Sequence, residues 1–411
     1  MRTKAKKKLL LVTAAFFTGF LVVTIKLSYV MIAQADKYLS LARNLHQRDR
    51  EIKAPRGSIY DRNGVKIASN KAVYSISVIY SQVTDREKVI KVLSENLKIK
   101  ESLIRKKVYK NSVREKIKSN VEKDIADRIR KFKLDGVKVD EDYKRVYPYN
   151  NLASKVLGFT GGDNQGIIGL EVFYDRYLKG KSGRIRTLTD GSGIEIDGAY
   201  EEREEPVAGG DLYISLDVNL QNYAVQACKK VKKEKKAKQV SMILMNPQNG
   251  EIYAMANSTS YNLESPRDDK NLLKKYSQSQ VNKMSEKEKT KAFNEIWKNP
   301  IVSNAFEPGS TYKPFTVAAG LEEGILKGNE TYYCDGYQKV GPHTIHCSHR
   351  SGHGLITLSQ SISLSCNDAL MQIAAKEGKN VFARYQKNFN FGNKTGIDLP
   401  GEAQTASLLH D

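Results

Sequence analysis

The sequence predicts a membrane-anchored protein of mixed α/β (α+β) class, with an N-terminal transmembrane helix followed by at least two folded domains. Three observations support this prediction. An apolar segment stands near the N-terminus, a charge-rich region with spaced Val, Ile and Leu follows it, and a strand, helix, strand, strand pattern begins near residue 211. At 411 residues and 40% hydrophobic content, the chain is large enough to build a core in each domain.

Residues 9–25 form an uninterrupted run of apolar and small residues, and five basic residues precede it: Arg2, Lys4, Lys6, Lys7 and Lys8. The run exceeds a signal-peptide core and can extend to Ala33 if Lys26 snorkels. We therefore predict a basic tail and an uncleaved single-pass anchor over residues 1–35. The basic flank predicts a cytoplasmic N-terminus and an extracytoplasmic bulk. A cleaved signal peptide is the alternative, because residues 33–35 fit the small-residue cleavage pattern.

The net charge of +21 raises the question of a nucleic-acid partner. The lysines are spread along the chain and no nucleic-acid-binding motif is legible, so we predict no nucleic acid. A basic surface also suits work beside anionic lipid headgroups and wall polymers. Four cysteines are too few for a disulfide scaffold.

A change of pattern near residue 206 marks the expected domain boundary. An acidic run, Pro206 and a Gly-Gly pair are followed by an expected strand over 211–216, a helix over 218–236 and strands over 240–246 and 251–256. We expect residues 261–298 to form a polar surface loop with one helix. In the first domain, residues 36–205, the charged segment 81–145 predicts short amphipathic helices. Residues 206–411 form the second domain.

Ser310 and Lys313 form a Ser-x-x-Lys at the expected start of a helix. Positions i and i+3 share one helix face, so the amine of Lys313 can reach the Ser310 hydroxyl and act as its base. The positive potential of the helix N-terminus favours the alkoxide. The alternative for the tetrapeptide alone is a capping Ser followed by a solvated Lys.

A second motif, Ser365-Cys366-Asn367, follows Ser310 and Lys313. Together these residues resemble the active-site set of penicillin-recognising serine acyl transferases. Further segments narrow the resemblance to class B penicillin-binding proteins, the monofunctional peptidoglycan D,D-transpeptidases. These are Arg-Gly-Ser-Ile-Tyr-Asp-Arg-Asn-Gly at 56–64, Gly-Ile-Ile-Gly-Leu-Glu at 166–171 with Tyr174 and Leu178, Met-Asn-Pro-Gln-Asn-Gly-Glu-Ile-Tyr-Ala-Met-Ala at 245–256, and Thr-Gly-Ile-Asp-Leu-Pro-Gly-Glu at 395–402.

The resemblance implies an elongated, non-catalytic, dimerisation-type pedestal over 36–205, with 81–145 as an insertion, and a penicillin-recognising α/β sandwich over 206–411. It implies that Ser310 is the nucleophile, Lys313 its base, and Ser365 and Asn367 the groups that relay protons and hold the substrate amide. The implied ligands are stem pentapeptides and β-lactams, the implied partners are a polytopic glycosyltransferase or division and elongation proteins, and no cofactor is required. One alternative is a non-catalytic membrane scaffold. Another is a β-lactam sensor or β-lactamase, but proteins of that class lack a long pedestal, so residues 36–205 argue against it.

The family's third motif is a Lys-Thr-Gly strand, and Lys394-Thr395-Gly396 spells it. We expect a loop here instead, because the triplet follows Asn367 too closely and precedes the family's Ile-Asp-Leu-Pro-Gly-Glu turn. On this interpretation the transpeptidase fold is incomplete at Asp411, before the catalytic third motif. The chain would then be a fragment or a naturally truncated form.

A metal site is a further hypothesis. Some class B members are reported to bind zinc beside the active site, and His353 and Cys366 match those ligand positions. Cys334 and Cys347 would complete a tetrahedral Cys₃His site. The alternatives are a Cys334–Cys347 disulfide, which suits an extracytoplasmic location, or reduced cysteines.

Overall fold

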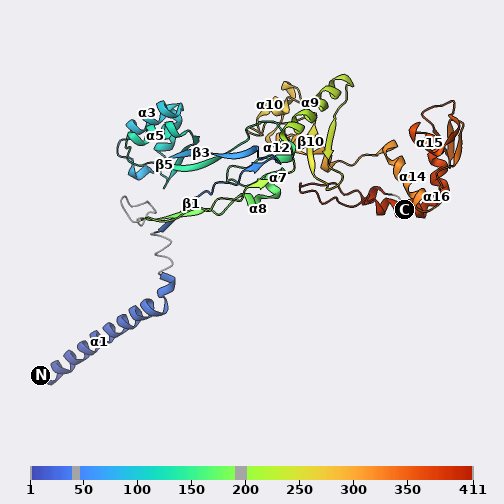
Figure 1. Cartoon of the computed structure of the whole chain (residues 1–411). Coiled ribbons are helices and arrows are strands. Elements are labelled where there is room, and N and C mark those ends of the chain that lie inside the picture. Colours follow the sequence, from blue (N-terminus) through green and yellow to red (C-terminus); the bar gives the residue numbers. More distant parts are fainter. Residues whose placement is uncertain (1, 39–46, 190–200, 410–411) are drawn as a thin grey trace.

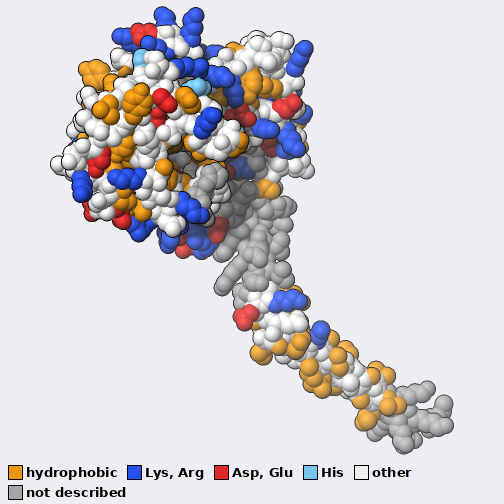
Figure 2. All heavy atoms as spheres, turned by 90° about the vertical axis from the view of Figure 1, so that its right-hand side faces the viewer, with side chains coloured by type: hydrophobic (Ala, Val, Ile, Leu, Met, Phe, Trp, Pro, Cys, Tyr) orange, Lys and Arg blue, Asp and Glu red, His pale blue; other side chains and the backbone are white. Residues whose placement is uncertain are grey.

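The N-terminal helix contains a long apolar segment. The structure, a computed structural model, describes residues 2–38, 47–189 and 201–409. Helix α1 (Arg2–Ser28) continues into a π-helical turn, Tyr29–Ala33, and Leu9–Ala33 is long and apolar enough to cross a membrane. Its Thr13, Thr18 and Thr24 hydroxyls donate to carbonyls four residues earlier, so these polar groups are satisfied inside the helix. Figure 2 shows hydrophobic side chains along this helix, which is the helix expected from the sequence.

Two sheets form the elongated body that follows (Figure 1). The first has the order β1-β6-β7 and is antiparallel; its strands are Gln47–Ile52, Gly183–Leu188 and Glu202–Glu204. The second has the order β4-β3-β2-β8, with β5 also paired to β3. Its strands are β2 Ile59–Tyr60, β3 Lys66–Val78, β4 Glu115–Val121, β5 Val137–Val146 and β8 Leu212–Tyr213. The long β3–β5 ladder runs from Ser69↔Val146 to Val78↔Val137.

The inserted segment forms a small α+β subdomain. Helices α3 (Arg86–Leu97), α4 (Glu101–Val108) and α5 (Lys123–Lys131) pack on β3, β4 and β5 around a core of their own. The short helices expected over 81–145 are confirmed, but the strands of this segment, β4 and most of β5, were not predicted. The strands were missed because charged residues alternate with few apolar ones, as in Glu-Lys-Ile-Lys-Ser-Asn-Val of β4, and that pattern resembles a solvated helix face as closely as it resembles a strand.

Three short helices follow β5 in the chain: α6 (Ser154–Leu157), α7 (Gly169–Phe173) and α8 (Asp175–Leu178). A buried charge network joins the sheet to α7 and α8. Arg56 Nε donates to Glu171 Oε2 at 2.6 Å, and Arg145 Nε donates to Glu171 Oε1 at 2.7 Å. Arg56 Nη1 also contacts Asp175 Oδ1 at 2.6 Å. The side chains of Arg56 and Glu171 are both 0% exposed. Buried charges persist only when they are paired and hydrogen-bonded in this way.

Gly57 allows the next contact, between the body and the start of the second domain. A Cβ at this position would lie 1.8 Å from the carbonyl oxygen of Gly210. Gly57 N donates to the Leu178 carbonyl at 2.8 Å, and Ser58 N donates to Asp211 Oδ1 at 2.7 Å. Only glycine therefore permits this backbone approach.

The second domain begins with α9 (Val218–Glu234), β9 (Ser241–Met245) and β10 (Ile252–Asn257), close to the predicted ranges. The expected strand over 211–216 was too long: β8 spans two residues because it pairs in parallel only with the equally short β2. The segment expected as a surface loop with one helix contains α10 (Asp269–Leu272), α11 (Gln278–Lys283) and α12 (Glu286–Trp297), and α13 (Pro300–Ser303) follows. That expectation was wrong because Tyr261, Leu272, Val281 and Trp297 of the segment enter the core.

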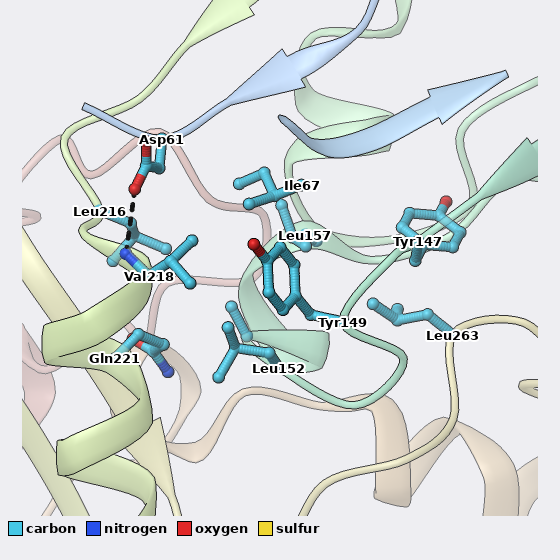
Figure 3. Close-up of a pocket in the computed structure, with 11 residues that line it drawn as sticks. Asp61, Ile67, Tyr147, Tyr149, Leu152, Leu157, Leu216, Val218, Gln221 and Leu263 are labelled. Carbon is cyan, nitrogen blue, oxygen red and sulfur yellow. Dashed lines mark hydrogen bonds between the residues drawn. The ribbon is translucent and has the colours of Figure 1, made fainter. Parts of the chain in front are cut away.

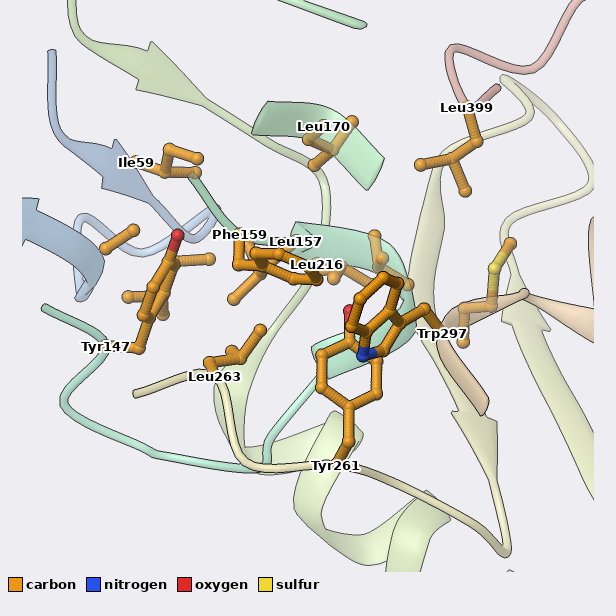
Figure 4. Close-up of a cluster of buried hydrophobic side chains, with 14 of the residues drawn as sticks. Ile59, Tyr147, Leu157, Phe159, Leu170, Leu216, Tyr261, Leu263, Trp297 and Leu399 are labelled. Carbon is orange, nitrogen blue, oxygen red and sulfur yellow. The ribbon is translucent and has the colours of Figure 1, made fainter. Parts of the chain in front are cut away.

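The main core lies where the two domains meet (Figure 4). Phe159 of the first domain packs against Trp297 with ring centroids 4.8 Å apart and against Tyr261 in an edge-to-face arrangement. Ile59, Leu170, Leu216 and Leu399 belong to the same buried cluster. Burial of this apolar surface makes the two domains one packed unit at this junction.

A small apolar space in this junction is a packing gap (Figure 3). Its volume is about 10 Å³, and Asp61, Ile67, Tyr149 and Leu216 are among its walls. Asp61 Oδ2 accepts a hydrogen bond from Val218 N at 3.1 Å, which ties the first domain to the start of α9. A space of this size holds one water at most, so it is no candidate ligand site.

The last part of the chain forms a separate lobe on the right of Figure 1. It contains the 3₁₀ turn η3 (Gly309–Tyr312), α14 (Lys313–Glu322), α15 (Leu358–Ser363), α16 (Asn367–Asn388) and η4 (Ala406–Leu408). Two hairpin-like pairs accompany the helices, β11–β14 and β12–β13: Thr331–Cys334, Gly354–Thr357, Tyr337–Val340 and His343–His346. Val317, Tyr332, Ile356 and Ile373 share a buried cluster that holds α14 against α16.

Replacing Glu171 by Ala tests the buried network. The change leaves Arg56 and Arg145 without their shared carboxylate, and breaking a buried pair costs about 3–5 kcal/mol. We expect the free energy of unfolding, measured by urea denaturation of the detergent-solubilised protein, to fall by about this amount. Glu87→Ala, which breaks the exposed pair with Arg105, is the matched control and should change stability little. Equal losses in the two variants would contradict the account.

Candidate functional site

Ser310 lies on an exposed turn at the entrance to α14. The 3₁₀ turn η3 carries Ser310, and α14 begins at Lys313, so the Ser-x-x-Lys stands at a helix start as predicted. Gly309 has φ +58°, a left-handed value that favours glycine, and no atom lies within 4 Å of where its Cβ would be. Ser310 itself is exposed.

Lys313 is the centre of a short hydrogen-bonded cluster. Its Nζ donates to Asn367 Oδ1 at 2.7 Å, to Ser365 Oγ at 3.0 Å and to the Ser365 carbonyl at 2.7 Å. All three protons of the ammonium are used, and the lysine is pinned in one geometry. Three of the four predicted catalytic residues are thus brought together from positions more than fifty residues apart.

The second motif owes its geometry to a left-handed residue before α16. Ser365 has φ +51°, an uncommon conformation for a residue other than glycine. It aims both the carbonyl and the hydroxyl of Ser365 at Lys313. Asn367, the first residue of α16, is oriented by its own Nδ2, which donates to the His346 carbonyl at 3.0 Å. The Asn367 side chain therefore links β13 to the lysine.

Burial lowers the pKa of Lys313 below its usual value, while the nearby Cys347 and Cys366 act in the opposite direction. A lowered pKa increases the fraction of neutral amine, which is the form that accepts a proton. No hydrogen bond joins Ser310 Oγ to Lys313 Nζ among the described residues. Ser310 lies three residues before the base, on the 3₁₀ turn that leads into its helix.

A second cluster lies directly beside this one. Cys334, Cys347, His353 and Cys366 each place one ligand atom within 4.8 Å of all the others. His353 Nδ1 lies 3.5 Å from Cys347 Sγ and 3.6 Å from Cys334 Sγ, and the sulfurs of Cys347 and Cys366 are 3.8 Å apart. Zn–S bonds of about 2.3 Å and Zn–N bonds of about 2.0–2.1 Å in a tetrahedron give edges of about 3.5–3.8 Å. The donor set therefore fits zinc in both chemistry and spacing.

Among the described residues, all four cysteines are free thiols, so the structure does not contain the alternative Cys334–Cys347 disulfide. Although burial raises the pKa of Cys347, hydrogen bonds from the backbone N–H groups of His349 and Asn367 outweigh it and hold that pKa at about 6. Burial raises the pKa of Cys366. The start of α16 thus stabilises a thiolate at Cys347, the protonation state that binds metals.

Sequence reasoning missed Asp368, which supports both clusters. It is 1% exposed, and its carboxylate accepts from Gln338 Nε2 and Gln372 Nε2 at 2.8 Å and from Asp335 N at 3.3 Å. These bonds fasten the segment after Cys334 to α16. A charged residue directly after the second motif was the available signal.

The triplet at 394–396 lies in a loop, as expected. Thr395 N and Oγ1 both donate to Glu402 Oε1, at 2.6 and 2.7 Å, and these bonds lower the pKa of Glu402. The loop then returns to the first domain, where Asp398 Oδ2 accepts from the Tyr174 hydroxyl at 2.7 Å. Its contacts are those of a structural turn.

Comparison with known families and proteins agrees with this geometry. Residues 51–214 match the penicillin-binding protein dimerisation domain, and residues 240–407 match the penicillin binding protein transpeptidase domain. Stage V sporulation protein D of Bacillus subtilis is 33% identical over 97% of this chain and 59% of the relative. The peptidoglycan D,D-transpeptidase MrdA of Acinetobacter baumannii is 27% identical over 93% of this chain and 58% of the relative.

Among solved structures, penicillin binding protein 2X of Streptococcus thermophilus aligns with a TM-score of 0.67 at 23% identity, over 87% of this chain and 54% of that one. The chain spans somewhat less than two thirds of the length of these relatives. The two domain matches, their order and the shared fold lead to one conclusion: the chain belongs to the class B penicillin-binding proteins.

Proposed function

We propose that the protein is a serine D,D-transpeptidase that crosslinks peptidoglycan stem peptides through an acyl-enzyme on Ser310. The observation that carries the proposal is the Lys313 cluster, in which one partly buried lysine with a lowered pKa contacts Ser365 and Asn367 three residues after an exposed serine. Such a lysine is a competent base for a neighbouring hydroxyl.

In the first step, neutral Lys313 takes the proton of Ser310 while Oγ attacks the carbonyl carbon of the penultimate D-Ala. The tetrahedral oxyanion receives a hydrogen bond from the Ser310 backbone N–H. Collapse forms the ester, breaks the peptide bond and releases terminal D-Ala, whose amine takes a proton from Lys313 or through Ser365. An amine of a second stem peptide then attacks the ester carbonyl and gives its proton to Lys313, directly or through Ser365. The new peptide bond forms as the ester bond breaks, and Ser310 Oγ takes up that proton to become a hydroxyl again.

Asn367 and Ser365 have separate roles in this scheme. The Ser365 hydroxyl, bonded to Lys313 Nζ, relays protons between the lysine and the leaving amine. The Asn367 amide holds Lys313 in place and positions the substrate amide. β-Lactams enter as substrate mimics whose ester on Ser310 persists. This chemistry requires no cofactor, and the N-terminal helix would hold the domain outside the cytoplasmic membrane, beside a polytopic glycosyltransferase or other division and elongation proteins.

We also propose that Cys334, Cys347, His353 and Cys366 hold a structural zinc ion. A bound ion would tie together β11, the segment after β13 and the N-terminus of α16. The ion would crosslink the three cysteine side chains and the histidine side chain in one fixed arrangement. Because Cys366 lies between Ser365 and Asn367, these ligands would restrict the second motif to the geometry that meets Lys313.

Replacing Ser310 by Ala tests the nucleophile. We expect fluorescent penicillin to form a covalent adduct with the wild-type protein, expressed with any coding sequence that continues in frame beyond codon 411, and the variant to form none. Ser363→Ala, which removes an exposed hydroxyl at the end of α15, should label like the wild type. Persistent labelling of the Ser310 variant would place the nucleophile elsewhere.

Lys313→Ala is expected to slow acylation by about 10²–10⁴-fold, since the general base is lost while the hydroxyl remains. Lys394→Ala is the matched control, because it removes the same charge from a loop lysine. Its acylation rate, measured by stopped-flow or timed gel labelling, should stay close to wild type. If the Lys394→Ala variant folds but loses most of its acylation rate, the triplet at 394–396 is catalytic.

For the metal, we expect about one zinc ion per chain by mass spectrometry of the purified protein. Cys347→Ser and Cys366→Ser should each lose most of the bound metal, and Co²⁺ substitution in the wild type should give thiolate-to-metal absorption. Cys228→Ser is the control, because Cys228 is buried in a different cluster against Ala224, Ala254 and Ala256. A metal-free protein carrying a Cys334–Cys347 disulfide would contradict the zinc proposal.

A further inference from the structure

A cavity rich in lysine lies apart from the acyl-transfer site. It has a volume of about 290 Å³ and is enclosed by α6, the end of α9, the segment after β10, the segment after α10, and the end of α12. Six lysines are among the residues that line it: Lys155, Lys232, Lys238, Lys274, Lys275 and Lys298. The lining includes none of Ser310, Lys313, Ser365 and Asn367. The function proposed above therefore leaves this cavity unexplained.

The charge in the cavity is far from balanced. Glu295 is the single carboxylate among the described lining residues, and it is already paired with Lys275 at 2.6 Å. In the part of the chain that the structure describes, none of the other five lysines has a carboxylate within 4.0 Å. Surface lysines usually avoid such crowding because like charges repel at short range. Five lysines without a carboxylate partner therefore line one cavity.

The protein holds two of these lysines in place through its backbone. Lys155 Nζ donates to the carbonyls of Ile296 and Lys298, at 2.6 and 2.8 Å, near the end of α12. Lys274 Nζ donates to the Ser260 carbonyl at 2.7 Å. These bonds hold the two ammonium groups in fixed positions at the cavity wall.

Burial, and then the charge of Lys275, lowers the pKa of Lys155 to about 8. Burial and the charge of Lys229 lower the pKa of Lys274 in the same way. In both groups burial is the larger cause, and a neighbouring ammonium adds to it. A bound anion would relieve this repulsion.

The residue types indicate the class of anion. All cations lining the cavity are lysines, and none is arginine. Arginine's planar fork matches carboxylate and phosphate alike, whereas lysine binds either group as a point charge. Five lysines without a carboxylate partner therefore suit a multiply charged phosphate group better than a single carboxylate. Gln239, Thr259, Ser260 and Asn304 add neutral hydrogen-bonding groups to the walls. These groups suit the neighbouring hydroxyl or ester oxygens of a phosphorylated sugar or polyol.

We propose that this cavity binds a phosphate group of an anionic ligand, separately from the stem-peptide site. Its volume is near the lower limit of ligand cavities, about 300 Å³, so it holds one phosphate-bearing unit at a time. Figure 1 shows α9, α10 and α12 at a distance from the membrane helix α1. That position favours a phosphodiester-linked polymer over a lipid headgroup, while a small soluble phosphate compound offers the same chemistry.

Calorimetric titration of the detergent-solubilised protein tests the proposal, with short poly(glycerol phosphate) and inorganic phosphate as separate probes at fixed ionic strength. We expect saturable binding with one site per chain. The double variant Lys232→Ala/Lys298→Ala should weaken binding by at least about tenfold, because two charge-assisted contacts are lost. The variant with Arg at both positions keeps the charge and should retain most of the affinity. Tighter binding of the polymer than of inorganic phosphate identifies the polymer as the source; equal affinity identifies a soluble phosphate.

The control is Lys233→Ala/Lys235→Ala, which removes two exposed lysines from the same end of α9 outside the cavity. It should change affinity by less than about twofold, because exposed charges are screened by salt. Equal weakening in the cavity and control variants would mean that the net charge of the protein attracts phosphate diffusely. Binding of neither probe to the folded wild-type protein would overturn the proposal as well.

Discussion

The shared carboxylate of Glu171 is the buried interaction that holds together the part of the first domain that meets the second. Arg56 and Arg145 both bond to it, and all three side chains are almost completely buried. Charges in such a position are stable only when every partner is present. This network fixes the segment around Arg56, the end of β5 and helix α7 relative to one another.

Other contacts at the domain junction follow from that arrangement. With Arg56 fixed, Gly57 meets the backbone of Gly210, and Asp61 reaches the N-terminus of α9. The aromatic contacts of Phe159 with Tyr261 and Trp297 then bury the junction. In the last lobe, Lys313 has the corresponding role, because its bonds to Ser365 and Asn367 join α14 to α16 beside the Cys₃His cluster.

Local patterns were sufficient to predict the membrane helix, helix α9, the β9–β10 pair and the helix that begins at Lys313. Each of these depends on periodicity or on a motif within a few residues. The strands of the inserted subdomain were not predictable in this way, since β4 and β5 carry charges at exposed positions and become strands by pairing with β3. Likewise, Trp297 and Tyr261 were expected in a polar loop, and their burial depends on a cluster that includes the distant Phe159.

The candidate site was likewise predicted only in part. Resemblance singled out Ser310, Lys313, Ser365 and Asn367, and the four possible zinc ligands, before any geometry was available. It did not indicate the left-handed Ser365, the buried Asp368, or the lysine cavity. These features depend on backbone conformation and on elements far apart in the chain, which no short motif records.

The most direct test of the acyl-transfer account is peptide mapping by mass spectrometry of the penicillin-treated protein. The account predicts a mass increase equal to one intact penicillin, carried as an ester on Ser310 within the peptide that contains residues 307–313. An adduct on any other residue of a folded protein, or a stable adduct on Lys313 itself, would contradict it.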